Sequence, residues 1–360
     1  MPRSRSAYTP GVLDHFIQQL ARGAALDPTQ VSAAVTALVD ESLSPETKAA
    51  FLTTLAQKGE TTAEIAAFAR ALRDRSVAVP LDAATRSGEI LDVCGTGGDR
   101  LNTFNISTTV AVLCAAAGIT VAKHGNRAIT SQSGSADVLE ALGVPVDLTP
   151  ELAAASLRDR RFAFLFAPRF HPAFRHLGPA RRLCADRGQR TIFNFLGPLL
   201  NPAQPTVQLI GVPRPELCEP MAKVLQSLGV RRGMVVCGEV PLPDGTAFLD
   251  ELSTLGETTI AEFYHDRGFS LSRLSPRDFP LQPATLADLA GGDRTANAEI
   301  IRRVLTGREQ GPKRDAVLLN AGAALFLAGK SKSFGEGWSL AEELIAQGQA
   351  AAKLAQLCAP

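Results

Sequence analysis

Asp92-Val-Cys-Gly-Thr-Gly-Gly-Asp99 is the stretch of this chain that decides the fold. It continues a short apolar run that begins at Ile90 and is typical of a buried strand. The three glycines permit positive φ angles and a close approach of backbone N–H groups to an anion. Asp99 adds a carboxylate, which beside phosphates serves as a metal ligand or contacts a ribose hydroxyl. The order predicts a strand that ends in an anion-binding turn, with a plain tight turn as the alternative interpretation of the glycines alone.

Three further polar motifs follow this turn. In Asn105-Ile-Ser-Thr108, small hydroxyl residues open an apolar helical pattern, where hydroxyl and N–H groups can bind phosphate oxygens. Lys123-His-Gly-Asn-Arg127 places two cations, an imidazole and an amide directly after a second apolar run. A solvated loop is the alternative there. Ser131-Gln-Ser-Gly-Ser-Ala-Asp137 is another small-residue loop that runs into a helical pattern, and it is a second candidate anion-binding turn.

The bulk properties exclude several classes of protein. The chain has 360 residues, of which 45% are hydrophobic and 20% charged, so it can bury a full core and is not disordered. A net charge of +1 gives no reason to expect a nucleic-acid or membrane partner. The six cysteines form no CxxC pair and are typical of reduced cytosolic thiols. With no apolar leader and no membrane-spanning window, we expect a cytoplasmic protein.

The first 80 residues carry a helical pattern and predict a small all-helical N-terminal domain over 1–80. Thr9-Pro10, Asp27-Pro28 and Ser44-Pro45 each place a capping oxygen before a proline at the first helical position. Thr61-Thr-Ala-Glu64 has the form of a capping box. Helices this short each bury one apolar stripe and must pack on one another or on a partner.

From about Ser87 the pattern changes to short β-rich runs that alternate with helical segments. The expected strands are Ile90–Cys94, Ile119–Ala122, Phe162–Phe166, Val207–Val212, Met234–Cys237 and Thr259–Phe263. The expected helices are Val110–Ala117, Ala136–Leu142, Pro215–Leu228, Ala316–Leu327 and Leu340–Leu357. This alternation predicts a large α/β domain over 81–360, with a central, largely parallel sheet flanked by helices. The segment 77–88 is the expected joint.

A second group of polar residues is separated from these motifs in sequence. His171 follows an expected strand, and Gly197-Pro198 begins a rigid turn. Several arginines lie between them, and one of these is expected to bind a substrate carboxylate bidentately. Asp250-Glu251 is typical of a polar loop, but beside a polyphosphate it supplies the hard oxygen ligands that Mg²⁺ prefers.

The order of these motifs resembles that of the anthranilate phosphoribosyltransferases over nearly the whole chain. The motifs that carry the resemblance are Gly95–Asp99, Asn105–Thr108, Lys123–Arg127, Ser133–Asp137, His171–Ala173, Arg190–Asn194, Gly197–Pro202 and Asp250-Glu251. The resemblance implies the fold of the nucleoside phosphorylase/phosphoribosyltransferase superfamily, a small helical domain joined to a large α/β domain. It implies that a segment near 172–190 also joins the helical domain. It further implies a homodimer that contacts through the helical domains.

The resemblance also implies an activity, which is transfer of the phosphoribosyl group of 5-phosphoribosyl 1-pyrophosphate (PRPP) to the amine of anthranilate. The products are N-(5-phosphoribosyl)anthranilate and pyrophosphate, in tryptophan biosynthesis. Lys123, Asp250 and Glu251 would be the catalytic residues. The PRPP-binding residues would be Gly95, Gly98, Asp99, Thr103, Asn105, Ser107, Thr108, Lys123 and Ser135. Two Mg²⁺ ions on the pyrophosphate would be held by Ser107, Asp250 and Glu251. The anthranilate residues would be Gly95, His124, Asn126, His171, Arg181, Gly197 and Pro198.

Two assignments stay open within the resemblance. The family pattern before Ile192 is three residues shorter than the sequence here, which indicates an insertion near 182–188. Counting forward from His171 assigns the acceptor arginine to Arg181, whereas counting back from Gly188 reaches Cys184, and Arg182 is a further alternative. For Ser135, the neighbouring Ser131 and Ser133 are alternatives.

Three other functions are compatible with the motifs. A phosphoribosyltransferase for another aromatic amine would share the donor residues. A pyrimidine nucleoside phosphorylase shares the fold, but Lys123–Arg127 matches the anthranilate enzymes better. A non-enzymatic nucleic-acid-binding relative should have a dominant basic groove, against which the near-neutral charge and the Asp250-Glu251 pair both argue.

Overall fold

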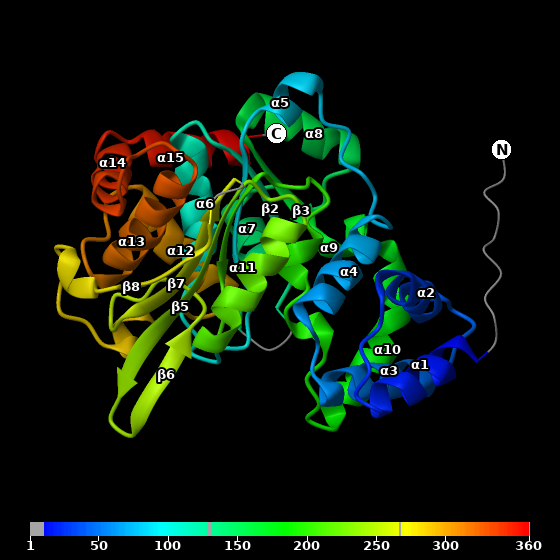
Figure 1. Cartoon of the computed structure of the whole chain (residues 1–360). Helices are drawn as coiled ribbons and strands as arrows, with labels where there is room; N and C mark the ends of the chain where they lie inside the picture. Colours follow the sequence, from blue (N-terminus) through cyan, green and yellow to red (C-terminus); the bar gives the residue numbers. More distant parts are fainter. Residues whose placement is uncertain (1–10, 129–131, 266–267, 360) are drawn as a thin grey trace. The chain divides into compact units, whose positions relative to one another are not determined.

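The computed structural model describes residues 11–128, 132–265 and 268–359, and it divides into two compact units (Figure 1). Unit 1 comprises Met1–Ser76 and His171–Leu200, and unit 2 comprises Val77–Phe170 and Asn201–Pro360. Relative to the expected division, unit 1 ends four residues earlier and its second segment runs ten residues further. The chain enters unit 2 at Val77 and leaves it again after Phe170. The Val77 N–H donates to the Phe170 carbonyl at 2.8 Å, so this bond joins the two ends of the first segment of unit 2.

In the described residues of unit 1, the regular elements are all helices. Its elements are α1 (Val12–Ala21), α2 (Pro28–Val39), α3 (Pro45–Lys58), α4 (Thr62–Arg73), η1 (Pro172–Leu177), α10 (Gly178–Asp186), η2 (Ile192–Asn194) and η3 (Gly197–Leu200). The side chains of Asp27, Ser44 and Thr61 accept backbone N–H groups of α2, α3 and α4, as their sequence predicts. The predicted start at Thr9-Pro10 lies outside the described residues. α10, from the second segment, packs on α3 from the first.

Unit 2 is built on one eight-stranded sheet. Its strands are β1 (Ile90–Gly95), β2 (Thr120–Gly125), β3 (Phe162–Phe166), β4 (Val207–Gly211), β5 (Arg232–Leu242), β6 (Gly245–Leu249), β7 (Thr258–Tyr264) and β8 (Ser270–Leu274). The order is β3-β2-β1-β4-β5-β7-β8, with β6 paired to β5. The pairs from β3 through β5 are parallel and the pairs of β6, β7 and β8 are antiparallel. The predicted α/β class with a largely parallel sheet is confirmed.

Helices flank this sheet. They are α5 (Ala83–Ser87), α6 (Ile106–Ala116), α7 (Ser135–Leu142), α8 (Pro150–Arg160), α9 (Ala167–Phe170), η4 (Pro215–Leu217), α11 (Cys218–Ser227), η5 (Pro276–Asp278), η6 (Leu286–Leu289), α12 (Arg294–Leu305), α13 (Pro312–Leu327), α14 (Phe334–Ala346) and α15 (Gln349–Cys358). The single helix predicted over Leu340–Leu357 is wrong. It is two helices, α14 and α15, because Gly348 adopts a left-handed φ of 73°. No helix of the described residues is long and apolar enough to cross a bilayer.

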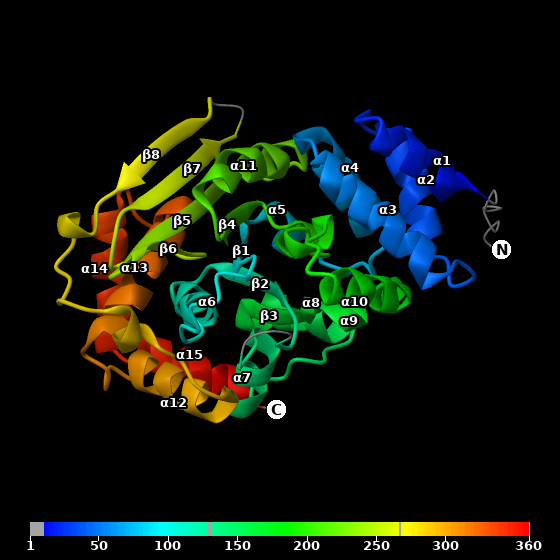
Figure 2. The same ribbon diagram turned by 90° about the horizontal axis from the view of Figure 1, so that it is seen from below.

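Alternate residues of the strands face two different cores. Leu91 and Val93 of β1 belong to the larger core with α6 and α13, whereas Ile90 belongs to a smaller core under α8. Figure 2 shows α13 and α11 on opposite sides of β5. Because β1, β2 and β4 are parallel, their carboxyl ends, Gly95, Gly125 and Gly211, lie at one edge of the sheet. That edge is where ligands bind in open α/β sheets.

Candidate functional site

The glycine turn after β1 closes around the carboxylate of Asp250. Gly97 and Gly98 have φ angles of 76° and 88°, in the left-handed region that favours glycine. The Gly97 N–H donates to Asp250 Oδ2 at 2.6 Å. A methyl group on Gly95 would overlap that carboxylate, and one on Gly211, the register partner of Gly95 in β4, would overlap the Asp250 carbonyl. Glycines at two adjacent strand ends therefore admit the Asp250 backbone and side chain.

Glu251 lies at the amino end of α6. Its Oε1 accepts the N–H of Ser107 at 3.1 Å, where the helix dipole favours a negative charge. Burial nevertheless raises the pKa of Glu251 to about 7, and the charge of Lys123 opposes that rise. Burial, followed by the nearby carboxylates of Asp99 and Glu251, raises the pKa of Asp250 well above its usual value. The two predicted metal ligands are thus adjacent and mutually repulsive, a situation that a divalent cation relieves.

Lys123 lies beneath these groups. It is on β2, only 1% exposed, and its Nζ donates to the Val93 carbonyl at 2.6 Å and to Ser107 Oγ at 3.3 Å. The structure therefore brings together Lys123, Ser107 and Glu251. A serine hydroxyl and two carboxylates are hard oxygen donors of the kind that Mg²⁺ takes, usually with substrate phosphates completing its shell. In the described part of the chain, no three His, Cys, Asp or Glu side chains are grouped as a metal site by themselves.

The other predicted donor residues lie in the loop before α6 and in the first turns of α6 and α7. Asn105 precedes α6, and its Nδ2 donates to the Ser133 carbonyl at 3.3 Å. Thr108 is buried in the first turns of α6, and Thr103 forms a β-bridge with Ala290. Ser135 is the first residue of α7. That these residues bind PRPP stays a prediction.

Asn126 and Arg127, just after β2, lie close to the start of α7. Ser135 Oγ donates to the carbonyl of Asn126 at 3.4 Å, so these two predicted residues are neighbours. Arg127 pairs with Asp137 at 3.1 Å, and Asp137 accepts the N–H of Gly134 at 3.0 Å. Of the alternatives to Ser135, Ser133 is buried and Ser131 lies outside the described residues.

Asp92 and Asn201 form a buried link for which the sequence assigned no role. Asn201 Nδ2 donates to Asp92 Oδ2 at 2.9 Å and to the Ala122 carbonyl at 2.7 Å. Asp92 Oδ1 accepts the backbone N–H of His124 at 3.4 Å. Burial raises the pKa of Asp92 to about 6, with Lys123 opposing the rise. Asn201 is the first residue after unit 1, so the link fixes the chain where it re-enters unit 2 and holds β2 next to β1. The sequence signal for this buried link was a carboxylate, Asp92, within an otherwise apolar strand.

The predicted acceptor residues of unit 1 are connected by aromatic rings. The His171 ring stacks on Phe174 with centroids 4.9 Å apart, and Phe174 meets Phe193 edge-on at 5.9 Å. The guanidinium of Arg181 lies over Phe193, 5.3 Å from its centroid. Burial lowers the pKa of His171 to about 4, which makes the imidazole neutral near pH 7. Phe174 and Phe193 were not predicted as site residues, although both lie within or beside quoted motifs.

α10 distinguishes the candidate acceptor positions. Arg181 is half-buried against Phe193, whereas Arg182 is exposed. Cys184 is buried, and its thiol donates to the Ala49 carbonyl of α3 at 3.7 Å. Pro198 is buried and Gly197 exposed in η3. The remaining predicted acceptor residues, Gly95, His124 and Asn126, belong to unit 2.

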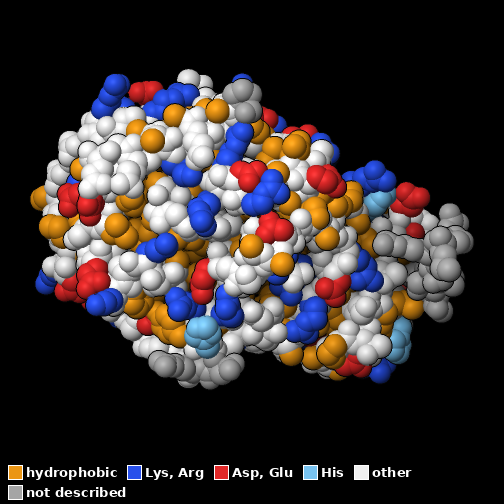
Figure 3. All heavy atoms as spheres, turned by 90° about the horizontal axis from the view of Figure 1, so that it is seen from above, with side chains coloured by type: hydrophobic (Ala, Val, Ile, Leu, Met, Phe, Trp, Pro, Cys, Tyr) orange, Lys and Arg blue, Asp and Glu red, His pale blue; other side chains and the backbone are white. Residues whose placement is uncertain are grey.

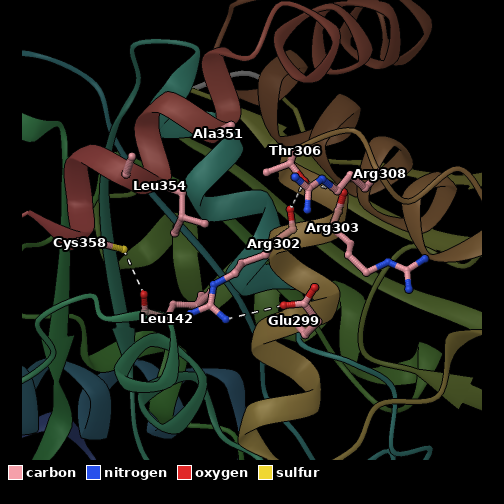
Figure 4. Close-up of a pocket in the computed structure, with 10 residues that line it drawn as sticks. Leu142, Glu299, Arg302, Arg303, Thr306, Arg308, Ala351, Leu354 and Cys358 are labelled. Carbon is pink, nitrogen blue, oxygen red and sulfur yellow. Dashed lines mark hydrogen bonds and ion pairs between the residues drawn. The ribbon is translucent and has the colours of Figure 1, made fainter.

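A separate cavity of about 310 Å³ opens beside α12 and α15, and none of the predicted site residues lines it (Figure 4). Arg302 and Glu299 lie on one wall, where their side chains approach to 3.8 Å, and Leu354 and Cys358 come from α15. Arg302 also donates to the Ala141 carbonyl at 3.0 Å. Arg302 and Glu299 are therefore already engaged in structural contacts.

The helical segment at 14–76 matches the helical bundle domain of the glycosyl transferase family, and 87–351 matches its a/b domain. An anthranilate phosphoribosyltransferase of Geobacter sp. (strain M21) is 47% identical over 326 residues, covering 88% of this chain and 89% of that protein. The chain belongs to the anthranilate phosphoribosyltransferase family. The resemblance predicted from the motifs is thereby confirmed. A family member of Petrotoga mobilis is 40% identical, with 96% of both chains covered.

Solved structures of the family share the fold. That of the Thermus thermophilus enzyme superposes with a TM-score of 0.84 at 41% identity, covering 95% of this chain and 98% of that one. The Saccharomyces cerevisiae enzyme, in complex with PRPP and Mg, has a TM-score of 0.85 at 28% identity, covering 97% and 98%. Another structure of the yeast enzyme contains 4-fluoroanthranilate.

Proposed function

We propose that this chain transfers the phosphoribosyl group of PRPP to the amine of anthranilate, which yields N-(5-phosphoribosyl)anthranilate and pyrophosphate in tryptophan biosynthesis. The observation that carries the proposal is the grouping of Asp250, Glu251, Ser107 and Lys123 beside the glycine turn. It combines anion-binding backbone with hard oxygen donors, as a metal–pyrophosphate complex requires. Family membership supports the same activity.

Mg²⁺ fits this grouping, and we propose that Ser107, Asp250 and Glu251 hold it, with two ions per PRPP. When bound, the metal supplies charge neutralisation for the leaving pyrophosphate. Lys123 orients the Ser107 hydroxyl and adds a fixed positive charge below it. The N–H groups of the glycine turn and of α6 are the proposed contacts of the phosphates, and Gly98, Asp99, Thr103, Asn105, Thr108 and Ser135 complete the proposed donor site.

The reaction breaks the bond between C1′ and the pyrophosphate oxygen and forms a bond between C1′ and the amine nitrogen. An aryl amine is neutral near pH 7 and attacks without prior loss of a proton. After the bond forms, the nitrogen gives up one proton to the departing pyrophosphate or to water. For this reason we assign His124 and His171 to positioning, and the burial of a neutral His171 agrees with that role. Asn126, Gly197 and Pro198 complete the proposed acceptor set.

We assign the anthranilate carboxylate to Arg181 rather than Arg182. The half-buried guanidinium over Phe193 is held in one orientation, and a fixed planar fork is what bidentate recognition of a carboxylate needs. We extend the proposal to a homodimer contacting through the helical domains, which rests on the sequence resemblance. We extend it also to a cytoplasmic location, which rests on six cysteines that form no CxxC pair.

A fluorescence assay tests the function. Anthranilate fluorescence should fall when the protein, PRPP and Mg²⁺ are combined, and mass spectrometry should find N-(5-phosphoribosyl)anthranilate. Parallel reactions with other aromatic amines, and with a pyrimidine nucleoside plus phosphate, test the alternative substrates. Absence of turnover by folded protein contradicts the proposal. On the face shown in Figure 3, basic and acidic side chains are interspersed, which gives no support to the nucleic-acid-binding alternative.

A further inference from the structure

The loop between the two main donor motifs is held in place by a distant part of the chain. It runs from Asp99 to Asn105, and it includes Arg100 and Asn102, whose φ angles of 60° and 53° are left-handed. Such angles are unfavourable for residues with side chains and persist only where surrounding contacts impose them. The loop therefore requires an external support.

That support is the segment 289–292, which precedes α12. The Phe104 N–H donates to the Leu289 carbonyl at 3.1 Å, and the Gly291 N–H donates to the Asn102 carbonyl at 2.9 Å. Between these bonds, Thr103 and Ala290 form an antiparallel bridge. A methyl group on Gly291 would lie 2.9 Å from the Phe104 Cα, so this close approach of the two backbones leaves no room for a side chain at 291.

Asn297 connects this support to the donor site. It is in the first turn of α12 and is 3% exposed. Its Oδ1 accepts the N–H of Gly292 at 2.8 Å, and its Nδ2 donates to Asn105 Oδ1 at 3.0 Å. Asn105 in turn donates through Nδ2 to the Ser133 carbonyl at 3.3 Å.

The pairing determines which way each amide points. The Gly292 N–H can only donate, so the oxygen of Asn297 must face it and its amino group must face Asn105. The oxygen of Asn105 must then face Asn297, and its amino group is directed toward Ser133. The orientation of a proposed PRPP-binding amide is thus set from α12, 192 residues away in the chain.

We propose that Asn297 is a positioning residue for PRPP binding, which acts by fixing the orientation of the Asn105 amide. This inference rests on the proposed function of the donor site. The residue touches no substrate in this role. Its removal should weaken PRPP binding selectively, because the anthranilate residues are elsewhere.

Asn297→Asp is the sharpest test, since aspartate has the same shape and can still accept from Gly292. It turns the donor that faces Asn105 into an acceptor and so removes the orienting bond. The KM for PRPP should rise about tenfold, the effect of one lost buried hydrogen bond, while the KM for anthranilate stays within about twofold. Asn297→Ala should show the same split, and Glu299→Gln, an exposed residue of the same helix, should show none.

A double-mutant cycle asks whether the effect passes through Asn105. In an Asn105→Ala background, Asn297→Ala should raise the PRPP KM no further. An undiminished rise in that background overturns the inference, as does an equal rise in both KM values or an unchanged PRPP KM in the single variants. Circular dichroism checks that each variant is folded, with Asn297→Ser replacing any that is not.

Calorimetric titration with PRPP and Mg²⁺ gives a second readout that needs no turnover. If the wild type binds PRPP without converting anthranilate, the proposed function fails, but the variants still test the inference through their PRPP affinity. If the wild type is active and Asn297→Asp binds PRPP normally, only the inference fails.

Discussion

The two groups of candidate residues are built on different physical principles. In unit 2, the ionisable groups are held by hydrogen bonds between elements distant in sequence; Asp92, Lys123 and Glu251 are buried, and Asp250 is half-buried. In unit 1, His171 and Arg181 are linked through aromatic rings, and the imidazole is neutral. A buried charge tolerates little displacement because its partners must remain in place. Stacked rings and a cation over a ring tolerate more, so we expect the donor group to be the less tolerant of substitution.

Removing both carboxyl charges should have the largest effect. Asp250→Asn combined with Glu251→Gln preserves shape and deletes the proposed metal ligands, so kcat/KM should fall about a thousandfold. Initial rates across a Mg²⁺ titration measure it. Glu257→Gln, an exposed residue near the same loop, is the matched control. A double variant that retains wild-type rates at every Mg²⁺ concentration would remove the proposed distinction between the two groups.

Arg181→Ala should have the next largest effect. That effect should be confined to the binding of anthranilate, the acceptor substrate. Loss of a charged hydrogen-bond donor should raise the KM for anthranilate about thirtyfold and leave that for PRPP nearly unchanged. Steady-state kinetics with each substrate varied in turn measure this split. Arg182→Ala, one residue along the same helix, should behave as wild type. The reverse result would assign the anthranilate carboxylate to Arg182 and would show that the register assumed through the three-residue insertion is wrong.

Asp92→Asn should lower stability by about 2 kcal/mol at pH 5, because its amide nitrogen must face one of two donors, Asn201 Nδ2 or the His124 N–H. The pKa of Asp92 is raised to about 6 in the folded state. The raised pKa means that the protonated carboxyl of Asp92 stabilises the folded protein. This stabilisation is present at low pH and is lost as the pH rises through 6, when the buried carboxyl ionises. Urea titrations should therefore show a smaller difference between wild type and variant at pH 7.5. Asp159→Asn, at an exposed aspartate, should show no such trend.

The smallest effect should be the pH dependence that His171 gives to unit 1. Its pKa is lowered to about 4, so its contribution to stability is present above the unfolded value of about 6.5 and is lost as the pH falls toward 4. Between pH 6.5 and 5.5, wild type should lose about 1 kcal/mol more than His171→Gln. Equilibrium unfolding at the two pH values measures the difference, and parallel losses in both proteins would indicate that the imidazole is not buried in solution.

The sequence predicted the parts of the fold that local chemistry determines. Caps such as Asp27 and Ser44 are local. Phe162–Phe166 is a continuous apolar run, and Ile90–Cys94 is apolar except for Asp92. β6 and β8 were missed because β8 is largely exposed and lacks an apolar face, and β6 is a short partner of β5. The break at Gly348 was missed because apolar spacing continues across it.

The candidate site was predictable to the extent that its residues lie in compact motifs. The sequence did not predict the roles of Asp92, Asn201 and Asn297. These roles depend on partners about 100 to 200 residues away, and no local pattern indicates such a pairing. Phe174 and Phe193 resemble ordinary core residues in sequence. Only their placement between His171 and Arg181 gives them a role in the candidate site.

The glycine pair at the ends of β1 and β4 has a consequence for how this protein can change by mutation. Gly95 and Gly211 are register partners, and a side chain at either would overlap Asp250. Substitution at one glycine cannot be rescued by substitution at the other, because each meets a different part of the same residue. Each single substitution at 95 or 211 should therefore be harmful by itself, and a library randomised at 95, 211 and 250 should contain no compensating pair. Active clones should retain all three residues together.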